Sequence, residues 1–196
     1  MTRRRLLTPF QERLAERLHG RQATSTVPDN AIWAGVAVVL APDPDAVLLI
    51  RRAERSGDPW SGQMGLPGGQ LDPADPDLTA TAIRETREEV GLTLTRAQLL
   101  GQLDDVSPRT PMPRPVVARP FVFAIADRPP LRFSDEVALA IWVELVELGR
   151  EGVHREAMVR VRGEDRSFPA YHLGPHLVWG LTERVLTPFL QLVDPR

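Results

Sequence analysis

The 196-residue chain contains no cysteine and no lysine, so all 24 of its basic side chains are arginines. The missing cysteine excludes disulfides, thiolate nucleophiles and sulfur-ligated metal sites. The missing lysine excludes Schiff-base chemistry. Besides histidine, guanidinium groups are therefore the only cationic side chains available to bind an anionic ligand. The four histidines are scattered without the spacing of metal ligands.

The chain also lacks any apolar run close to the ~20 residues that a membrane-spanning helix needs. Arginines at positions 3–5 are not followed by the apolar stretch of a signal peptide. We therefore expect a cytoplasmic protein with no membrane partner. A net charge of −2 argues against nucleic acid as a partner.

The length and composition predict one sizeable core, with 42% hydrophobic and 26% charged residues. We expect residues 1–30 to form an N-terminal helix and linker that pack on the main body, and residues 31–196 to form a single domain. The helix is predicted to start at Thr8, as an N-cap whose capping box Gln11 closes, and to end at Gly20.

Strands and helices follow one another in a mixed order along the main body. Apolar runs predict strands at 32–40, 46–52, 99–103, 116–126 and 137–143, and a hairpin at 158–162 and from 166 onward. Residues 53–66 are expected to form a loop. Helices are expected from an Asp75 N-cap to Val90, and at 175–186 with a kink or an end at Pro188. This order fits an α/β fold, an α/β/α sandwich on a mixed sheet.

Three carboxylates at helical spacing are the most informative feature of the chain. Glu85, Glu88 and Glu89 have offsets of zero, three and four, which place them on one helix face. Like charges at that spacing repel, whereas a hard divalent cation such as Mg²⁺ or Mn²⁺ binds clustered carboxylate oxygens. Gly68 and Gly69, just before the helix, allow the backbone to approach a phosphate or a metal closely.

These residues resemble the Nudix hydrolase signature, G-x5-E-x7-R-E-U-x-E-E-x-G-U, in which U is a bulky aliphatic residue. The matching residues, in order, are Gly69, Arg84, Glu85, Glu88, Glu89, Gly91 and Leu92. Asp75 replaces the first glutamate and lies one residue further from the arginine, and Thr86 replaces the aliphatic residue. The resemblance implies a Nudix-type α/β/α sandwich and a metal-dependent pyrophosphohydrolase that acts on a small molecule.

The spacing and the resemblance together assign roles to individual residues. We expect Glu85 and Glu89 to be the principal metal ligands, Glu88 to hold a second ion or its water shell, and the Gly69 carbonyl to add a ligand. Arg84 is expected to orient the glutamates. The general base is left open among Glu85, Glu88 and the outside candidate Glu136.

Several arginines are candidates for binding substrate phosphates. Arg52 is the one we favour, together with the backbone of Gly68 and Gly69. For each of the others, a solvated surface arginine is the competing interpretation. These others are Arg51, Arg109, Arg114 and Arg119.

Beyond the signature, the chain is most similar to the coenzyme A pyrophosphatase branch. That similarity rests on Leu48–Ala53, Gly62–Gly69, Tyr171 and the stretch Val178–Thr182, and is interrupted where Asp58-Pro59-Trp60-Ser61 displaces an arginine of the branch. It implies cleavage of coenzyme A or acyl-CoA to 3′-phosphoadenosine 5′-phosphate and 4′-phosphopantetheine.

Two alternatives remain at this point. The first is a Nudix hydrolase of ADP-ribose, a nucleotide sugar, a dinucleoside polyphosphate or an oxidised nucleotide. The second is a non-catalytic, nucleotide-sensing Nudix module, which the complete set of core glutamates disfavours. The oligomeric state is open, and a homodimer is among the options.

Overall fold

The computed structural model describes residues 7–25, 30–57, 60–109 and 114–193. Part of the linker predicted before residue 31, the first half of the 58–61 insertion and residues 110–113 lie outside these ranges. The helices are α1 (Pro9–Leu18), α2 (Leu78–Val90), α3 (Leu145–Leu148), α4 (Gly180–Val193) and a 3-10 turn at Arg96–Gln98. None of the helices in the described ranges is long and apolar enough to cross a membrane.

The strands form two sheets. The first contains β1 (Ile32–Ala41), β2 (Ala46–Arg52), β3 (Met64–Gly65), β4 (Gly68–Gln70), β5 (Leu99–Gln102), β6 (Val116–Ala124) and β7 (Val137–Glu144). The second contains β8 (His154–Val161), β9 (Glu164–Leu173) and β10 (His176–Trp179). In the first sheet β1 pairs parallel with β6 and antiparallel with β2 and β4, so the sheet is mixed as predicted.

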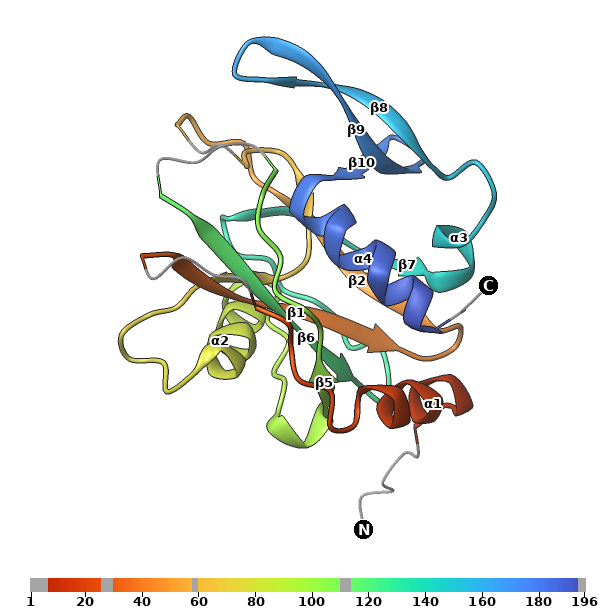
Figure 1. The fold of residues 1–196 in the computed structure, drawn as a ribbon. Helices are drawn as coiled ribbons and strands as arrows, with labels where there is room; N and C mark the ends of the chain where they lie inside the picture. Colours follow the sequence, from red (N-terminus) through yellow and green to blue (C-terminus); the bar gives the residue numbers. More distant parts are fainter. Residues whose placement is uncertain (1–6, 26–29, 58–59, 110–113, 194–196) are drawn as a thin grey trace.

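The apolar run of β1 is continuous because the strand is buried on both faces. Val38 and Leu40 face a core that also contains Leu186 of α4 and Leu14 of α1. Ala37, Val39 and Ala41 face a second core that contains Ala82 and Val90 of α2. The sheet therefore lies between α2 on one side and α1 with α4 on the other, which is the predicted α/β/α sandwich (Figure 1).

The N-terminal helix confirms its predicted start. Thr8 is the N-cap, its hydroxyl accepts from the Gln11 N–H at 3.2 Å, and the Gln11 side chain accepts from the Thr8 N–H at 3.1 Å. Leu14 and Leu18 are buried against the α4 side of the sheet. The division of the chain into an N-terminal segment and one domain stays a prediction.

Three predictions of secondary structure are wrong. The segment 53–66 is not all loop, because Met64–Gly65 pairs with Ile50 and Arg51 of β2. The N-cap of α2 is Asp77, not Asp75, and its carboxylate accepts from the Ala80 N–H at 2.9 Å. The last helix begins at Gly180 rather than at 175, because residues 176–179 pair with β9, and it continues through Pro188 to Val193.

Candidate active site

Two glycines bring β4 against the acidic face of α2. A Cβ at Gly68 would lie 2.5 Å from the Gly35 carbonyl oxygen, and one at Gly69 would lie 2.3 Å from Glu85 Oε1. At Gly68 the short distance is to backbone and excludes a side chain, whereas at Gly69 a side chain would displace the Glu85 carboxylate. The close approach lets the Gly68 N–H donate to Glu89 Oε2 at 2.9 Å.

Glu89 is the most deeply buried of the three glutamates, with 3% of its side chain exposed. Burial removes the water that would solvate the carboxylate and so raises its pKa to about 8, although the Gly68 N–H acts in the opposite direction. Arg52 Nη1 lies 3.8 Å from Glu89 Oε1. In the metal-free protein Glu89 is therefore a buried carboxyl that retains its proton at neutral pH.

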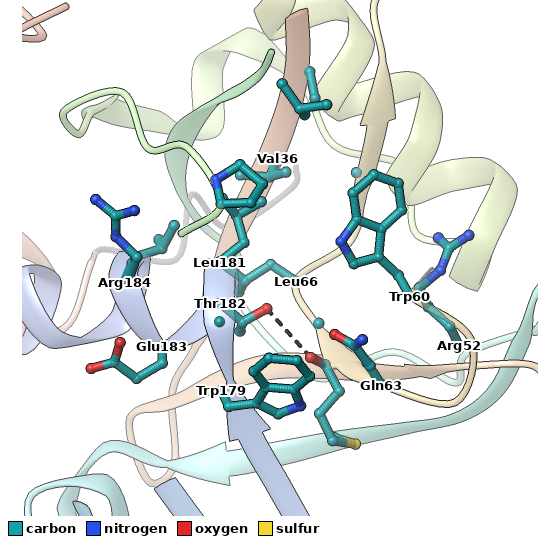
Figure 2. Close-up of a pocket in the computed structure, with 18 of the residues that line it drawn as sticks. Val36, Arg52, Trp60, Gln63, Leu66, Trp179, Leu181, Thr182, Glu183 and Arg184 are labelled. Carbon is teal, nitrogen blue, oxygen red and sulfur yellow. Dashed lines mark hydrogen bonds between the residues drawn. The ribbon is translucent and has the colours of Figure 1, made fainter. Parts of the chain in front are cut away.

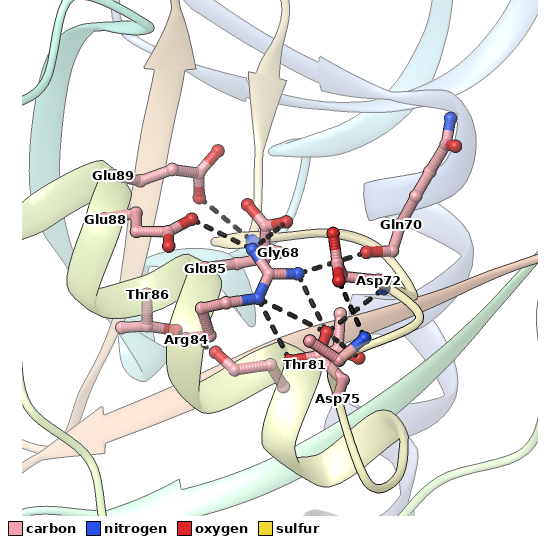
Figure 3. A network of polar contacts seen from close by, with 12 residues as sticks. Gly68, Gln70, Asp72, Asp75, Thr81, Arg84, Glu85, Thr86, Glu88 and Glu89 are labelled. Carbon is pink, nitrogen blue, oxygen red and sulfur yellow. Dashed lines mark hydrogen bonds and ion pairs between the residues drawn. The ribbon is translucent and has the colours of Figure 1, made fainter.

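Glu85 and Glu88 turn toward a common arginine. Arg84 Nη1 donates to Glu85 Oε1 at 2.8 Å and to Glu88 Oε2 at 2.9 Å (Figure 3). Burial raises the pKa of Glu85, and the charge of Arg84 partly offsets that effect. Glu88 is exposed at the rim. The Arg84 guanidinium thus bridges two carboxylates whose helical spacing alone predicts mutual repulsion.

Asp75 completes the grip on Arg84. The guanidinium donates to Asp75 through Nε at 3.1 Å and through Nη2 at 2.9 Å, and Nη2 also donates to the Gln70 carbonyl. The Arg84 hydrogen bonds lower the pKa of Asp75 to about 2. Asp75 thus acts in the site rather than as a helix cap. In the sequence, the signal for this role is that Asp75 stands where the Nudix signature has its first glutamate.

The donor set around α2 fits a hard divalent cation, because it consists of carboxylate and carbonyl oxygens. Within the described ranges, no three His, Asp or Glu side chains already converge on a point that would hold an ion. Arg84 holds Glu85 and Glu88, while Glu89 turns to Gly68 (Figure 3).

Glu136 lies beside the same acidic group. The segment before it docks on the end of α2, since the N–H groups of Arg132 and Ser134 donate to the carbonyls of Val90 and Glu89. The charge of Glu136 contributes to the raised pKa values of Glu85 and Glu89. Its carboxylate accepts from Arg55 Nη1 at 3.0 Å. The outside candidate for the base is therefore close to the predicted metal ligands.

A cavity of about 490 Å³ opens beside these carboxylates. Glu85, Glu89 and Glu136 line one end with Gly68, Gly69 and Arg52. Apolar side chains line the middle, and Figure 2 shows Trp60 and Trp179 on different elements around it with Leu66 and Leu181. The opposite wall comes from the β8–β9 hairpin, the loop at 108–109 and the start of α4. Glu88 is not part of the cavity lining.

The structure separates the candidate phosphate-binding arginines into two groups. Arg52 and Arg109 line the cavity, whereas Arg51 and Arg114 do not. Arg119 does not line it either, because it donates twice to Asp105, at 2.7 and 2.8 Å, and lies over the Trp33 ring. Of the predicted candidates, only Arg52 and Arg109 are positioned to contact a ligand there.

Other cavity residues were not predicted from the sequence, although several of them lay in motifs already noted. Trp60 belongs to the 58–61 insertion and Trp179 to the Val178–Thr182 stretch. The Thr182 hydroxyl of that stretch donates to the Met64 carbonyl at 3.3 Å, which fastens α4 to β3. Arg184 and Glu183, next to it, had no distinguishing pattern in the sequence.

The comparison with known proteins agrees with this geometry. The sequence profile described as the NUDIX domain matches residues 32–161, which includes β1, α2, Asp75, the three glutamates of α2 and Glu136. The chain is a Nudix hydrolase. The likeness extends to the branch, because relatives of this hydrolase include coenzyme A diphosphatases and NudL proteins, and these relatives support its assignment as a pyrophosphohydrolase.

Two curated relatives and one solved structure illustrate the match. An uncharacterized Nudix hydrolase NudL of Photorhabdus laumondii is 31% identical over 85% of this chain and 87% of its own length. The human mitochondrial coenzyme A diphosphatase NUDT8 is 35% identical over 76% of this chain and 64% of its own length. A MutT/nudix family protein from Enterococcus faecalis, at 21% identity, shares the fold with a TM-score of 0.59 over 92% of this chain and 72% of its own.

Proposed function

We propose that this Nudix hydrolase cleaves the pyrophosphate linkage of coenzyme A or acyl-CoA, giving 3′-phosphoadenosine 5′-phosphate and 4′-phosphopantetheine. The observation that carries the proposal is the cavity, which joins a carboxylate-lined end to an apolar middle and an arginine-bearing far wall. A long substrate with a central pyrophosphate, an aromatic base and further phosphate has complementary chemistry. The human relative that is named a coenzyme A diphosphatase supports the same substrate.

Nudix hydrolases generally use divalent metals, and we propose Mg²⁺ or Mn²⁺ here. Glu85 and Glu89 are the proposed principal ligands, with Glu88 at the rim and the Gly69 carbonyl as a further oxygen. When bound, such an ion neutralises phosphoryl charge and lowers the pKa of an attacking water. One nitrogen of Arg84 donates to both Glu85 and Glu88, and the Gly68 N–H donates to Glu89. These hydrogen bonds fix the positions of the three carboxylates.

Arg52 is the proposed contact to the pyrophosphate. It lines the cavity at the carboxylate end, and its guanidinium lies 3.8 Å from Glu89. At that position the Arg52 guanidinium can donate to an anionic phosphoryl oxygen and still remain next to the proposed metal ligands. Gly68 and Gly69 line the same end of the cavity, and because they carry no side chains a phosphate there can approach their backbone.

Glu136 is the proposed general base. It lines the same end of the cavity, comes from a different element than the metal ligands, and is held by Arg55. A carboxylate on that wall can take the proton of the attacking water while Glu85 and Glu89 serve the metal.

The direct test is hydrolysis of coenzyme A by purified protein with Mg²⁺ or Mn²⁺, followed by mass spectrometry of the products. We expect the two products above, and no turnover after chelation of the metal. A protein that binds nucleotides but releases no product from any pyrophosphate, with either metal, would instead be a nucleotide-sensing module. Cleavage of ADP-ribose or nucleotide sugars with coenzyme A left intact would place it among the other Nudix hydrolases.

A further inference from the structure

Two arginines on the far wall of the cavity have no carboxylate partner among the described residues. They are Arg109, on the loop after β5, and Arg184, in the first turns of α4. Most other arginines near the site are paired. Arg52 lies beside Glu89, Arg55 beside Glu136, and Arg160 lies 3.6 Å from Asp165.

The structure holds these two positive charges near each other. Arg184 Nη1 donates to the carbonyl of Ser107, two residues before Arg109, and so fastens the loop beside α4. Burial lowers the pKa of Arg184, and the neighbouring charge of Arg109 lowers it further. Two like charges held near each other against their repulsion favour the binding of an anion.

The carboxylate that precedes Arg184 in the chain is already engaged. Glu183 is buried, and its Oε1 lies 2.9 Å from His154 Nε2 and accepts from the Thr187 hydroxyl at 2.8 Å. Its charge is therefore directed toward the hairpin and α4, and does not close an ion pair with either arginine.

The pair lies away from the carboxylates that are proposed to bind the metal. Figure 2 shows Arg184 and Arg52 on opposite sides of the cavity, with Leu66 and Leu181 between them. An anion bound at Arg184 is thus not the phosphate that is cleaved beside Glu89. It is a second anionic group on the same molecule, separated from the first by an apolar portion.

We propose that Arg109 and Arg184 form a binding site for a phosphate monoester that the substrate carries away from the cleaved bond. This inference rests on the proposed function, since in coenzyme A that group is the 3′-phosphate of the adenosine half. Guanidinium groups suit a phosphate monoester because they donate two hydrogen bonds to its oxygens. The adenosine half then lies toward α4, and the scissile pyrophosphate lies toward α2.

The test compares kcat/KM for coenzyme A and for 3′-dephospho-coenzyme A under the same metal. The variants are Arg109→Gln and Arg184→Gln, and the matched control is Arg150→Gln, which removes an exposed positive charge outside the cavity. We expect each cavity variant to lower kcat/KM for coenzyme A about tenfold or more, and that for the dephospho form by less than about twofold. The control should change neither.

Unchanged discrimination in Arg109→Gln would overturn the site, and this exposed loop residue is the variant expected to fold normally. Equal cleavage of both substrates by the unaltered enzyme would also overturn it, while leaving coenzyme A hydrolysis standing. If neither substrate is cleaved, the proposed function fails and binding decides the site. Calorimetry should then show tighter binding of adenosine 3′,5′-bisphosphate than of AMP, lost in Arg109→Gln; equal binding would overturn the site.

Discussion

The two ends of the cavity carry opposite charge and are built differently. At the α2 end, carboxylates outnumber cations, and Arg84 and the Gly68 N–H hold them in place. At the α4 end, Arg109 and Arg184 face the cavity without a carboxylate partner in the described ranges. The first end needs a cation and the second needs an anion. We infer that the chemistry lies at α2 and the selection of the substrate at α4.

The two ends also differ in how far apart their residues lie in the chain. Gly68, Gly69, Asp75 and the α2 residues are close in sequence, so one helix and the turn before it build that end. The α4 end requires a loop and a helix that a hydrogen bond joins across 77 residues. A local motif therefore suffices for the reactive end, whereas the selective end depends on the whole fold.

Glu89→Gln should have the largest effect on the α2 end. The substitution keeps the size of the side chain but removes one carboxylate from the proposed metal site, and we expect kcat to fall by roughly three orders of magnitude. Steady-state kinetics with Mn²⁺, alongside a thermal melt, check this. The exposed Glu16→Gln should behave as the unaltered enzyme. A folded Glu89→Gln protein with normal kcat would refute the assignment.

Glu136→Gln should lower kcat by about a hundredfold, with a smaller change in KM, because it removes the proposed base but none of the proposed metal ligands. Asp135→Asn is the matched control, since its side chain is exposed and does not line the cavity. Retention of normal kcat in Glu136→Gln would move the base to Glu85 or Glu88.

Gly69→Ala should weaken metal binding about tenfold. Its Cβ would lie 2.3 Å from Glu85 Oε1, so the carboxylate has to move from its place beside Arg84. Titration of Mn²⁺ into metal-free protein measures the change. Gly149→Ala is the control, because its backbone is right-handed helical and its nearest neighbours lie 3.7 Å from the new Cβ. Equal Mn²⁺ affinity in both variants would show that the close contact at Gly69 is unimportant.

A smaller effect is expected on the pH dependence of stability without metal. The folded pKa of Glu89, about 8, exceeds its usual value of 4.5, so between these values the native state holds a proton that the unfolded state has lost. The free energy of unfolding should therefore fall as pH rises from 4.5 to 8, by up to a few kcal/mol. Urea titrations in EDTA measure this, and Glu89→Gln should flatten the slope. An equal slope in both proteins would contradict the burial argument.

The residues that could be predicted from the sequence are those whose roles are local. β1 and β2 follow from uninterrupted apolar runs, and the acidic face of α2 follows from helical spacing. The role of Asp75 was missed because Asp75-Pro76 and Asp77 offer two similar helix starts, and only Arg84 and Thr81 decide between them. The sequence predicts a helix from residue 175, whereas pairing with β9 makes residues 176–179 a strand.

The α4 end of the cavity has no local sequence signal, because its residues come together only in the folded chain. Arg109 was one of four arginine candidates that the sequence did not rank, behind the favoured Arg52, and Arg184 was not among them. Their proximity depends on the Ser107 carbonyl and on the place where α4 crosses the sheet. A charge without a partner is a property of the folded chain and cannot be recognised from spacing.

The most direct test of the account is a competition experiment in which coenzyme A, ADP-ribose, NADH and a nucleotide sugar share one solution with the enzyme and Mn²⁺. The relative rates of disappearance, followed by mass spectrometry, give the ratios of kcat/KM. We predict that coenzyme A is consumed first, with 3′-phosphoadenosine 5′-phosphate as a product. Consumption of ADP-ribose or the nucleotide sugar ahead of coenzyme A would contradict the account.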